Sequence, residues 1–116
     1  MLTGLKSVIY PTADLDEDKA FWQTVTGIKP YIDEPYYVSF KIGDCELGLD
    51  PNAAKEGISF PVAYWHVKDT KEASKKLLEA GAKVHTEIKD VGAGVMMGTF
   101  KDLTHNIFGI IDNPND

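Results

Sequence analysis

One pattern occurs twice in this chain, and that repeat constrains the fold more than any other feature. The first copy begins with a strand-like segment at Ser7, and the second copy begins with one at Val62. In both copies an aspartate follows seven residues later, a helix-like segment then ends at a glycine, and strand-like segments close the copy at a Pro-Asn pair. A repeat of this length predicts one supersecondary unit that is built twice.

Capping residues and helical spacing predict one helix in each copy. Asp14 is a suitable N-cap for a helix over residues 15–27, because acidic residues fill its first turn and Gly27 can end it in a left-handed conformation. The second helix is predicted over residues 70–81, with Asp69 as its N-cap.

The rest of the chain is strand-like. Alternating segments at 36–42 and 45–49 flank the turn Gly43-Asp44, and segments at 95–100 and 107–111 flank a longer loop. Residues 50–60 are rich in turn formers and mark the seam between the copies. The order is therefore βαβββ twice, an α+β fold with eight strands and two helices.

Length and composition narrow the class of protein. The 116 residues suit one domain, with modules at about 1–56 and about 57–116. A net charge of −6 argues against nucleic acid as a partner, and no apolar run is long enough to cross a membrane. The chain has one cysteine, Cys45, and no evident secretion signal, so we expect it in the reducing cytoplasm.

The order of these helix-like and strand-like segments resembles that of the vicinal oxygen chelate superfamily. This is the group of glyoxalase I, bleomycin-resistance proteins and extradiol dioxygenases. The resemblance rests on 8–15, Phe21-Trp22 with Gly27, 46–49, 67–69, and Asp102 with Asn106. It implies that the sheets of two βαβββ modules curl into an open, cup-like half-barrel. It also implies a homodimer with the cups near the interface.

Metal-using members of that superfamily bind a divalent ion with four strand residues that point into the cup. By the resemblance, these positions fall on Ser7, Glu46, Val62 and Gly109. Only Glu46 is a competent ligand, and a protein-held divalent ion normally needs three or more donors. We therefore expect no metal and no other cofactor.

Strand alternation extends this set to a candidate ligand-binding face. If Val62 faces the cup, then Tyr64 and His66 do so too, while the residues between them face the helix. Gly48 and Gly109 would leave room for a ligand, although a glycine there can also mark a close strand contact. The predicted ligand-binding residues are Ser7, Ile9, Glu46, Gly48, Val62, Tyr64, His66, Met97, Phe100 and Gly109.

Three functions remain open at this point. The predicted face is apolar and aromatic with one carboxylate and one imidazole, which is typical of a small-molecule binding site. A binding protein of bleomycin-resistance type is the leading interpretation. The alternatives are a glyoxalase-type lyase, isomerase or dioxygenase that uses Glu46 and His66 as catalytic residues with a metal, and an accessory subunit with a degenerate site.

Overall fold

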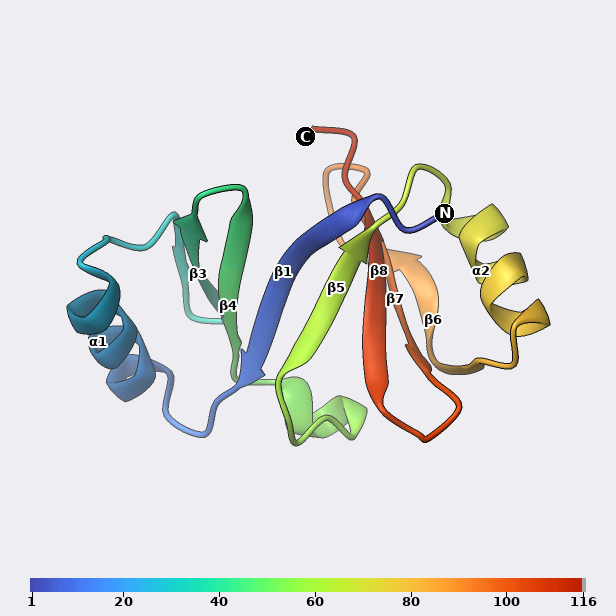
Figure 1. Ribbon diagram of the computed structural model, residues 1–116. Helices are drawn as coiled ribbons and strands as arrows, with labels where there is room; N and C mark the ends of the chain where they lie inside the picture. The colour runs from blue at the N-terminus through green and yellow to red at the C-terminus, as the bar shows by residue number, and fades with distance from the viewer. Residues whose placement is uncertain (116) are drawn as a thin grey trace. The chain divides into compact units, whose positions relative to one another are not determined.

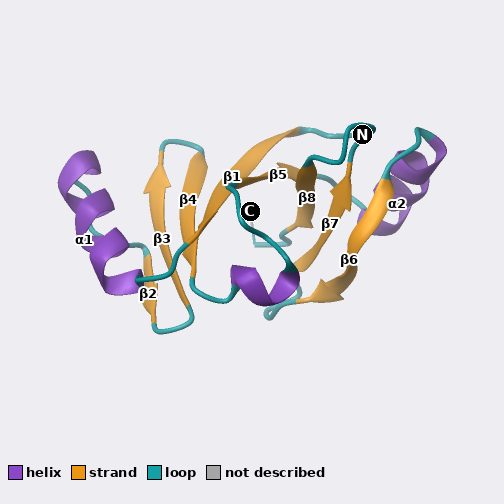
Figure 2. Cartoon of the chain, turned by 90° about the horizontal axis from the view of Figure 1, so that it is seen from below, coloured by secondary structure: helices purple, strands orange, loops and turns teal. Residues whose placement is uncertain are grey.

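The computed structural model describes residues 1–115, and it confirms the predicted α+β order of βαβββ twice. The chain divides into two compact units, which we describe separately: the first module, Ser7–Val62, and the second module, Met1–Lys6 with the chain from Ala63 onward. The predicted seam at residues 50–60 contains one element that the sequence did not indicate, a short 3-10 helix η1 (Ala53–Glu56) (Figure 2). Residue 116, the predicted end of the second module, lies outside the described residues.

The first module has a four-stranded sheet in the order β2-β3-β4-β1, in which β1 and β4 are parallel. Helix α1 lies on one side of β3 and β4 (Figure 1). Its elements are β1 (Gly4–Pro11), α1 (Leu15–Thr26), β2 (Ile32–Glu34), β3 (Tyr37–Ile42) and β4 (Cys45–Asp50).

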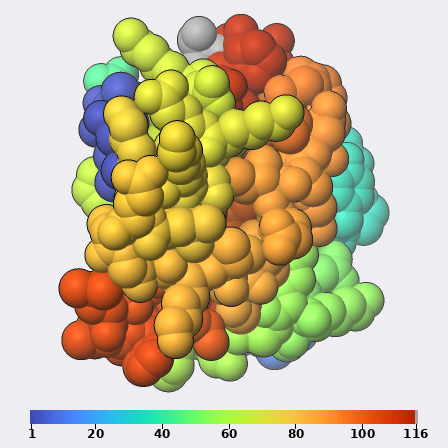
Figure 3. Space-filling model, turned by 90° about the vertical axis from the view of Figure 1, so that its right-hand side faces the viewer, coloured from blue at the N-terminus to red at the C-terminus, as the bar shows by residue number. Residues whose placement is uncertain are grey.

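The second module repeats this plan with the order β5-β8-β7-β6, in which β5 and β8 are parallel. The strand β6 lies at the edge of the sheet, and its pairing with β7 is irregular on both sides of Thr86. Helix α2 and β6 lie side by side on the surface (Figure 3). The elements are β5 (Val62–His66), α2 (Thr70–Glu79), β6 (Lys83–Asp90), β7 (Met96–Lys101) and β8 (Ile107–Asp112).

Helix α1 begins and ends as its capping residues predict. The Asp14 carboxylate accepts a hydrogen bond from the Glu17 amide at 3.0 Å, and Gly27 ends the helix with a φ of 71°. The apolar side of the helix packs on alternate strand residues. The core contains Val38, Phe40 and Leu49, with Tyr10, Leu15, Trp22 and Leu47 packed against it.

Helix α2 is shorter than the sequence predicted. Asp69 caps it by accepting hydrogen bonds from two backbone amides, but regular helix ends at Glu79 and Gly81 follows with a φ of 104°. The predicted end was therefore two residues too late, because the left-handed glycine lies beyond the last helical turn. The helix covers a core of Val67, Ala73, Leu77, Phe100 and Ile110.

Neither α1 nor α2 is long and apolar enough to cross a bilayer, and within residues 1–115 no other helix is either.

One carboxylate organises the loop between β7 and β8. Asp102 accepts hydrogen bonds from the backbone amides of Thr104 and Asn106, at 3.0 Å and 2.9 Å, and from the Asn106 side chain. These bonds, led by the Asn106 amide, lower the pKa of Asp102, because they stabilise its charged form. His105 lies in the same loop with a φ of 72°. This left-handed conformation is uncommon for a residue other than glycine.

We predict that Asp102→Asn lowers the melting temperature at pH 7. The pKa of Asp102 is lower in the folded than in the unfolded chain, so its stabilising effect is present above the unfolded pKa and is lost as the pH falls through the folded pKa. The difference between wild type and variant should therefore shrink below about pH 4. Thermal melts at pH 7 and pH 3 measure it, with Asp44→Asn in the exposed β3–β4 turn as the matched control. A difference that does not change with pH would contradict this assignment.

Candidate functional site

The sheet of the first module has one face under α1 and one face turned away from it. We call the second face the helix-distal face. On it, strand pairing places Glu46 directly between Ser7 of β1 and Lys41 of β3. Ser7 is buried and Glu46 is half-buried. The Lys41 ammonium lies 3.9 Å from the centre of the Tyr31 ring. Glu46 thus has a hydroxyl and an oppositely charged side chain as its cross-strand neighbours.

The next row of the same face contains a glycine beneath a tyrosine. Gly48 pairs with Ile9 on one side and with Ser39 on the other, and Ser39 pairs in turn with Ile32. A Cβ on Gly48 would lie 2.1 Å from the Tyr37 hydroxyl oxygen and 2.8 Å from the ring carbon that carries it. The end of the Tyr37 side chain therefore occupies the space above Gly48.

The helix-distal face of the second module also has a tyrosine over a glycine, but here the tyrosine comes from the first strand of the module, β5, and not from its third. Tyr64 pairs with Gly109, and a Cβ on Gly109 would lie 2.3 Å from two carbons of the Tyr64 ring. Tyr64 is buried, with 7% of its surface exposed. His66 pairs with Ile111, which pairs in turn with Met97, so these three side chains share this face.

Three site predictions need correction. Gly48 and Gly109 do not leave open space for a ligand, because tyrosine side chains of the same module fill it. Phe100 does not belong to the candidate face: it is 1% exposed and lies in the core beneath α2, because it is one residue out of phase with Met97 and Thr99. Gly109 lies opposite Tyr64, and Val62 is on the same face but is displaced along β5.

His66 is held by the N-terminal segment of its own module. The Thr3 hydroxyl lies 2.8 Å from His66 Nδ1, and both the hydroxyl and the backbone amide of Thr3 donate to the His66 carbonyl oxygen. These contacts fix the orientation of the ring and leave Nε2 as its second nitrogen. Sequence reasoning did not find Thr3, because nothing in its sequence context marks it as a partner of residue 66.

Two other residues of the face could have been found from the sequence. The turn at Gly43-Asp44 joins strands in which Ile42 pairs with Cys45. A two-residue hairpin loop fixes that register, so Lys41 must pair with Glu46 and Ser39 with Gly48.

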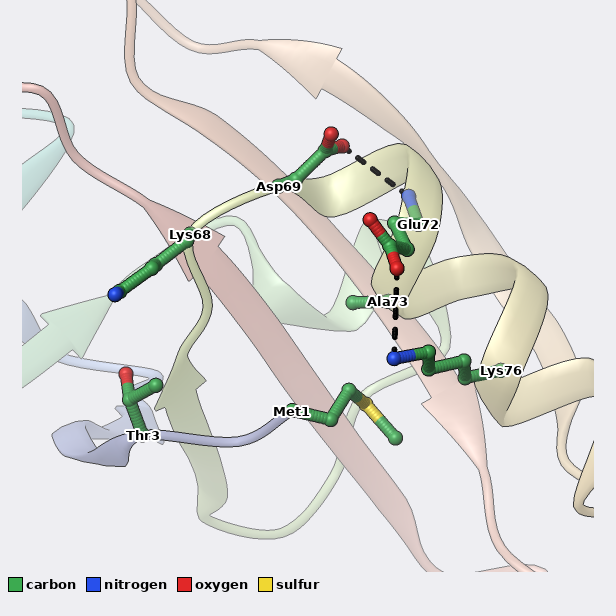
Figure 4. A pocket seen from close by; sticks show the side chains of 7 residues that line it. All are labelled: Met1, Thr3, Lys68, Asp69, Glu72, Ala73 and Lys76. Carbon is green, nitrogen blue, oxygen red and sulfur yellow. Dashed lines mark hydrogen bonds and ion pairs between the residues drawn. The ribbon is translucent and has the colours of Figure 1, made fainter.

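A hollow with a described lining lies elsewhere, at the start of α2 (Figure 4). It has a volume of about 270 Å³ and a mixed lining. Three of its four charged side chains already have partners, since Glu72 lies 3.4 Å from Lys76 and Asp69 caps the helix. We therefore do not assign it a ligand. The lining residues are Met1, Thr3, Lys68, Asp69, Glu72, Ala73 and Lys76.

The donor set does not fit a divalent metal ion. Of the four family positions, Glu46 carries a carboxylate and Ser7 a neutral hydroxyl, whereas Val62 and Gly109 carry no donor atom. The Tyr64 ring also covers Gly109. Within residues 1–115, no three His, Cys, Asp or Glu side chains gather as a metal site requires.

Residues 4–110 match the family described as the Glyoxalase/Bleomycin resistance protein/Dioxygenase superfamily. The chain belongs to this superfamily, and the resemblance drawn from the sequence is confirmed. No curated protein matches the chain.

Solved structures share the fold at low sequence identity. A member of the same superfamily from Vibrio splendidus 12B01 has a TM-score of 0.71 and 15% identity, with 94% of this chain and 99% of that chain covered. Methylmalonyl-CoA epimerase from Mycobacterium tuberculosis has a TM-score of 0.73 and 15% identity, with 98% and 91% covered. A Streptomyces coelicolor methylmalonyl-CoA epimerase variant in complex with 2-nitronate-propionyl-CoA has a TM-score of 0.75 and 16% identity, with 98% and 96% covered.

We predict that Gly109→Ala destabilises the protein by about 1–3 kcal/mol, because the new methyl group overlaps the buried Tyr64 ring. Urea denaturation measures the change. Gly4→Ala is the matched control, since a Cβ on this strand glycine meets no atom within 4 Å. The cost should fall in the Tyr64→Ala background, and equal costs in both backgrounds would rule out the overlap.

Proposed function

We propose that this protein binds a small apolar or aromatic molecule on its helix-distal faces and does so without a metal ion, in the manner of the bleomycin-resistance branch of its superfamily. The observation that carries the proposal is the donor set. Among the positions where the resemblance implies metal ligands, this chain has one carboxylate beside a serine, and a tyrosine ring lies above a bare glycine.

The chemistry of the faces supports an apolar or aromatic ligand. Ile9 lies on the face of the first module, and Ile111, Met97 and the Tyr64 ring lie on that of the second. Methionine adapts to ligands of different shape, and tyrosine offers an apolar ring with a polar end. Glu46 on the face of the first module and His66 on that of the second are the polar groups that would orient a ligand on each face.

The positive charge of Lys41 on the neighbouring strand bears on which ligand Glu46 can bind. Because Lys41 is its cross-strand neighbour, the carboxylate has a cation of the protein itself beside it. A ligand that carries both charges, or none, suits such a pair better than a metal ion does. The superfamily's usual homodimer remains our expectation for the assembly. The reducing cytoplasm remains our expectation for the compartment, because Cys45 is the single cysteine.

Elemental analysis tests the metal-free part of the proposal. Protein expressed with added Ni, Zn, Mn and Fe, and then desalted, should contain far less than one metal ion per chain. About one ion per chain, together with turnover of methylglyoxal hemithioacetal that is lost in Glu46→Gln, would contradict the proposal and support the enzyme.

A thermal-shift screen of aromatic compounds tests binding. A true ligand at 100 times its dissociation constant should add about 2.7 kcal/mol to the free energy of unfolding. Ile9→Lys, which places a charge on the helix-distal face, should abolish the shift. Leu78→Lys on the exposed side of α2 is the matched control and should keep it. A shift that survives Ile9→Lys would place the ligand elsewhere.

A further inference from the structure

The two modules each contain a buried hydroxyl group at a corresponding position, and these two groups differ in their hydrogen bonding. In each module a hydroxyl-bearing residue pairs with the glycine that lies under the tyrosine: Ser39 with Gly48, and Thr99 with Gly109. Both hydroxyl residues are almost fully buried, with 0% and 1% of their surface exposed. A buried hydroxyl normally has a hydrogen-bond partner, because its desolvation is otherwise uncompensated.

Thr99 has its partner on the adjacent strand. Its Oγ1 lies 2.5 Å from Thr86 Oγ1 and accepts a hydrogen bond from the Thr86 amide at 3.1 Å. The Thr99 amide in turn donates to Thr86 Oγ1 at 3.1 Å. The buried Thr99 hydroxyl therefore has its hydrogen-bond partners within the second module.

Ser39 has no such neighbour. The residue that pairs with it on β2 is Ile32, which offers only carbon atoms. Among residues 1–115, no atom is in hydrogen-bonding position to Ser39 Oγ. This hydroxyl lies on the helix-distal face in the same row as Gly48, so a molecule bound in that row can supply the missing partner.

Tyr37 covers this place but is not part of the core under α1. Its hydroxyl end lies above Gly48, yet the residue is only half-buried and stands first in β3, directly after the turn at 35–36. The core residues of β3, Val38 and Phe40, point to the opposite face. Rotation of the Tyr37 side chain would therefore leave the core under α1 intact.

We propose that the space above Gly48 and Ser39, which the Tyr37 side chain fills in the free protein, is a subsite for a ligand ring that carries a polar atom. The incoming ring displaces the Tyr37 side chain, lies between Ile9 and Ile32, and exchanges a hydrogen bond with Ser39 Oγ. Tyr37 acts as a cover that the ligand must move, and Ser39 selects a phenol-like ring over a plain hydrocarbon ring. The inference rests on the proposed function and specifies its ligand class.

The experiment uses 4-methylphenol and toluene as probes, because they match the tyrosine side chain with and without its hydroxyl. Amide chemical shifts of the full chain are followed in wild type and in Tyr37→Ala. In both proteins, 4-methylphenol should shift the amides of Ser39 and Gly48. It should bind Tyr37→Ala about tenfold more tightly or better, because the covered state no longer competes.

Selectivity assigns the role of Ser39. The Tyr37→Ala variant should prefer 4-methylphenol to toluene by about three- to tenfold, which is the range for one hydrogen bond. Adding Ser39→Ala should remove this preference. Tyr64→Ala is the matched control, since it uncovers Gly109 beside a hydroxyl that Thr86 already satisfies, and it should show no preference.

Three results would overturn the inference: wild-type amide shifts that avoid Ser39 and Gly48, equal affinity in wild type and Tyr37→Ala, or a preference that survives Ser39→Ala. The wild-type titration decides the matter even if a variant fails to fold. If aromatic compounds bind wild type and only these tests fail, the subsite is wrong and the proposed function stands. If the protein binds metal stoichiometrically and turns over substrate, the proposed function itself is wrong.

Discussion

The two-residue period of the strands, combined with a helix on one side of each sheet, determines where chemistry can occur in this protein. Residues on one side of the strands, such as Leu49 and Phe100, pack in the core beneath α1 or α2. Residues on the other side remain on the helix-distal face. A shift of one residue in register would exchange the two sets, so the pairing of β1 with β4 and of β5 with β8 fixes the site as firmly as it fixes the fold.

Much of the fold could be read from the sequence because its signals are local. Asp14 and Asp69 cap their helices as expected, and Gly43-Asp44 sets the first hairpin. The end of α2 was misplaced because Gly81 ends a helix from beyond its last turn.

The site was less predictable, because it depends on which side chain fills which space. Alternation correctly placed Tyr64 and His66 on one face, but it could not show that the Tyr64 ring lies on Gly109. Phe100 was assigned to the wrong face, because nothing in the sequence indicated which residues of β7 point toward α2. Ser39 escaped notice because a buried serine is ordinary until the atoms around it are known.

The irregular pairing of β6 with β7 also affects whether the edge of this sheet can aggregate with other molecules. At Thr86 and Thr99 the side-chain hydroxyls take the place of main-chain acceptors, and the ladder shifts on either side of Thr86. An edge strand that is bent in this way, with Lys83 and Lys89 along it, presents a poor template for another strand. The hydroxyl pair of Thr86 and Thr99 therefore has a second effect. It makes the edge strand β6 less able to pair with strands of other molecules and so to form fibrils.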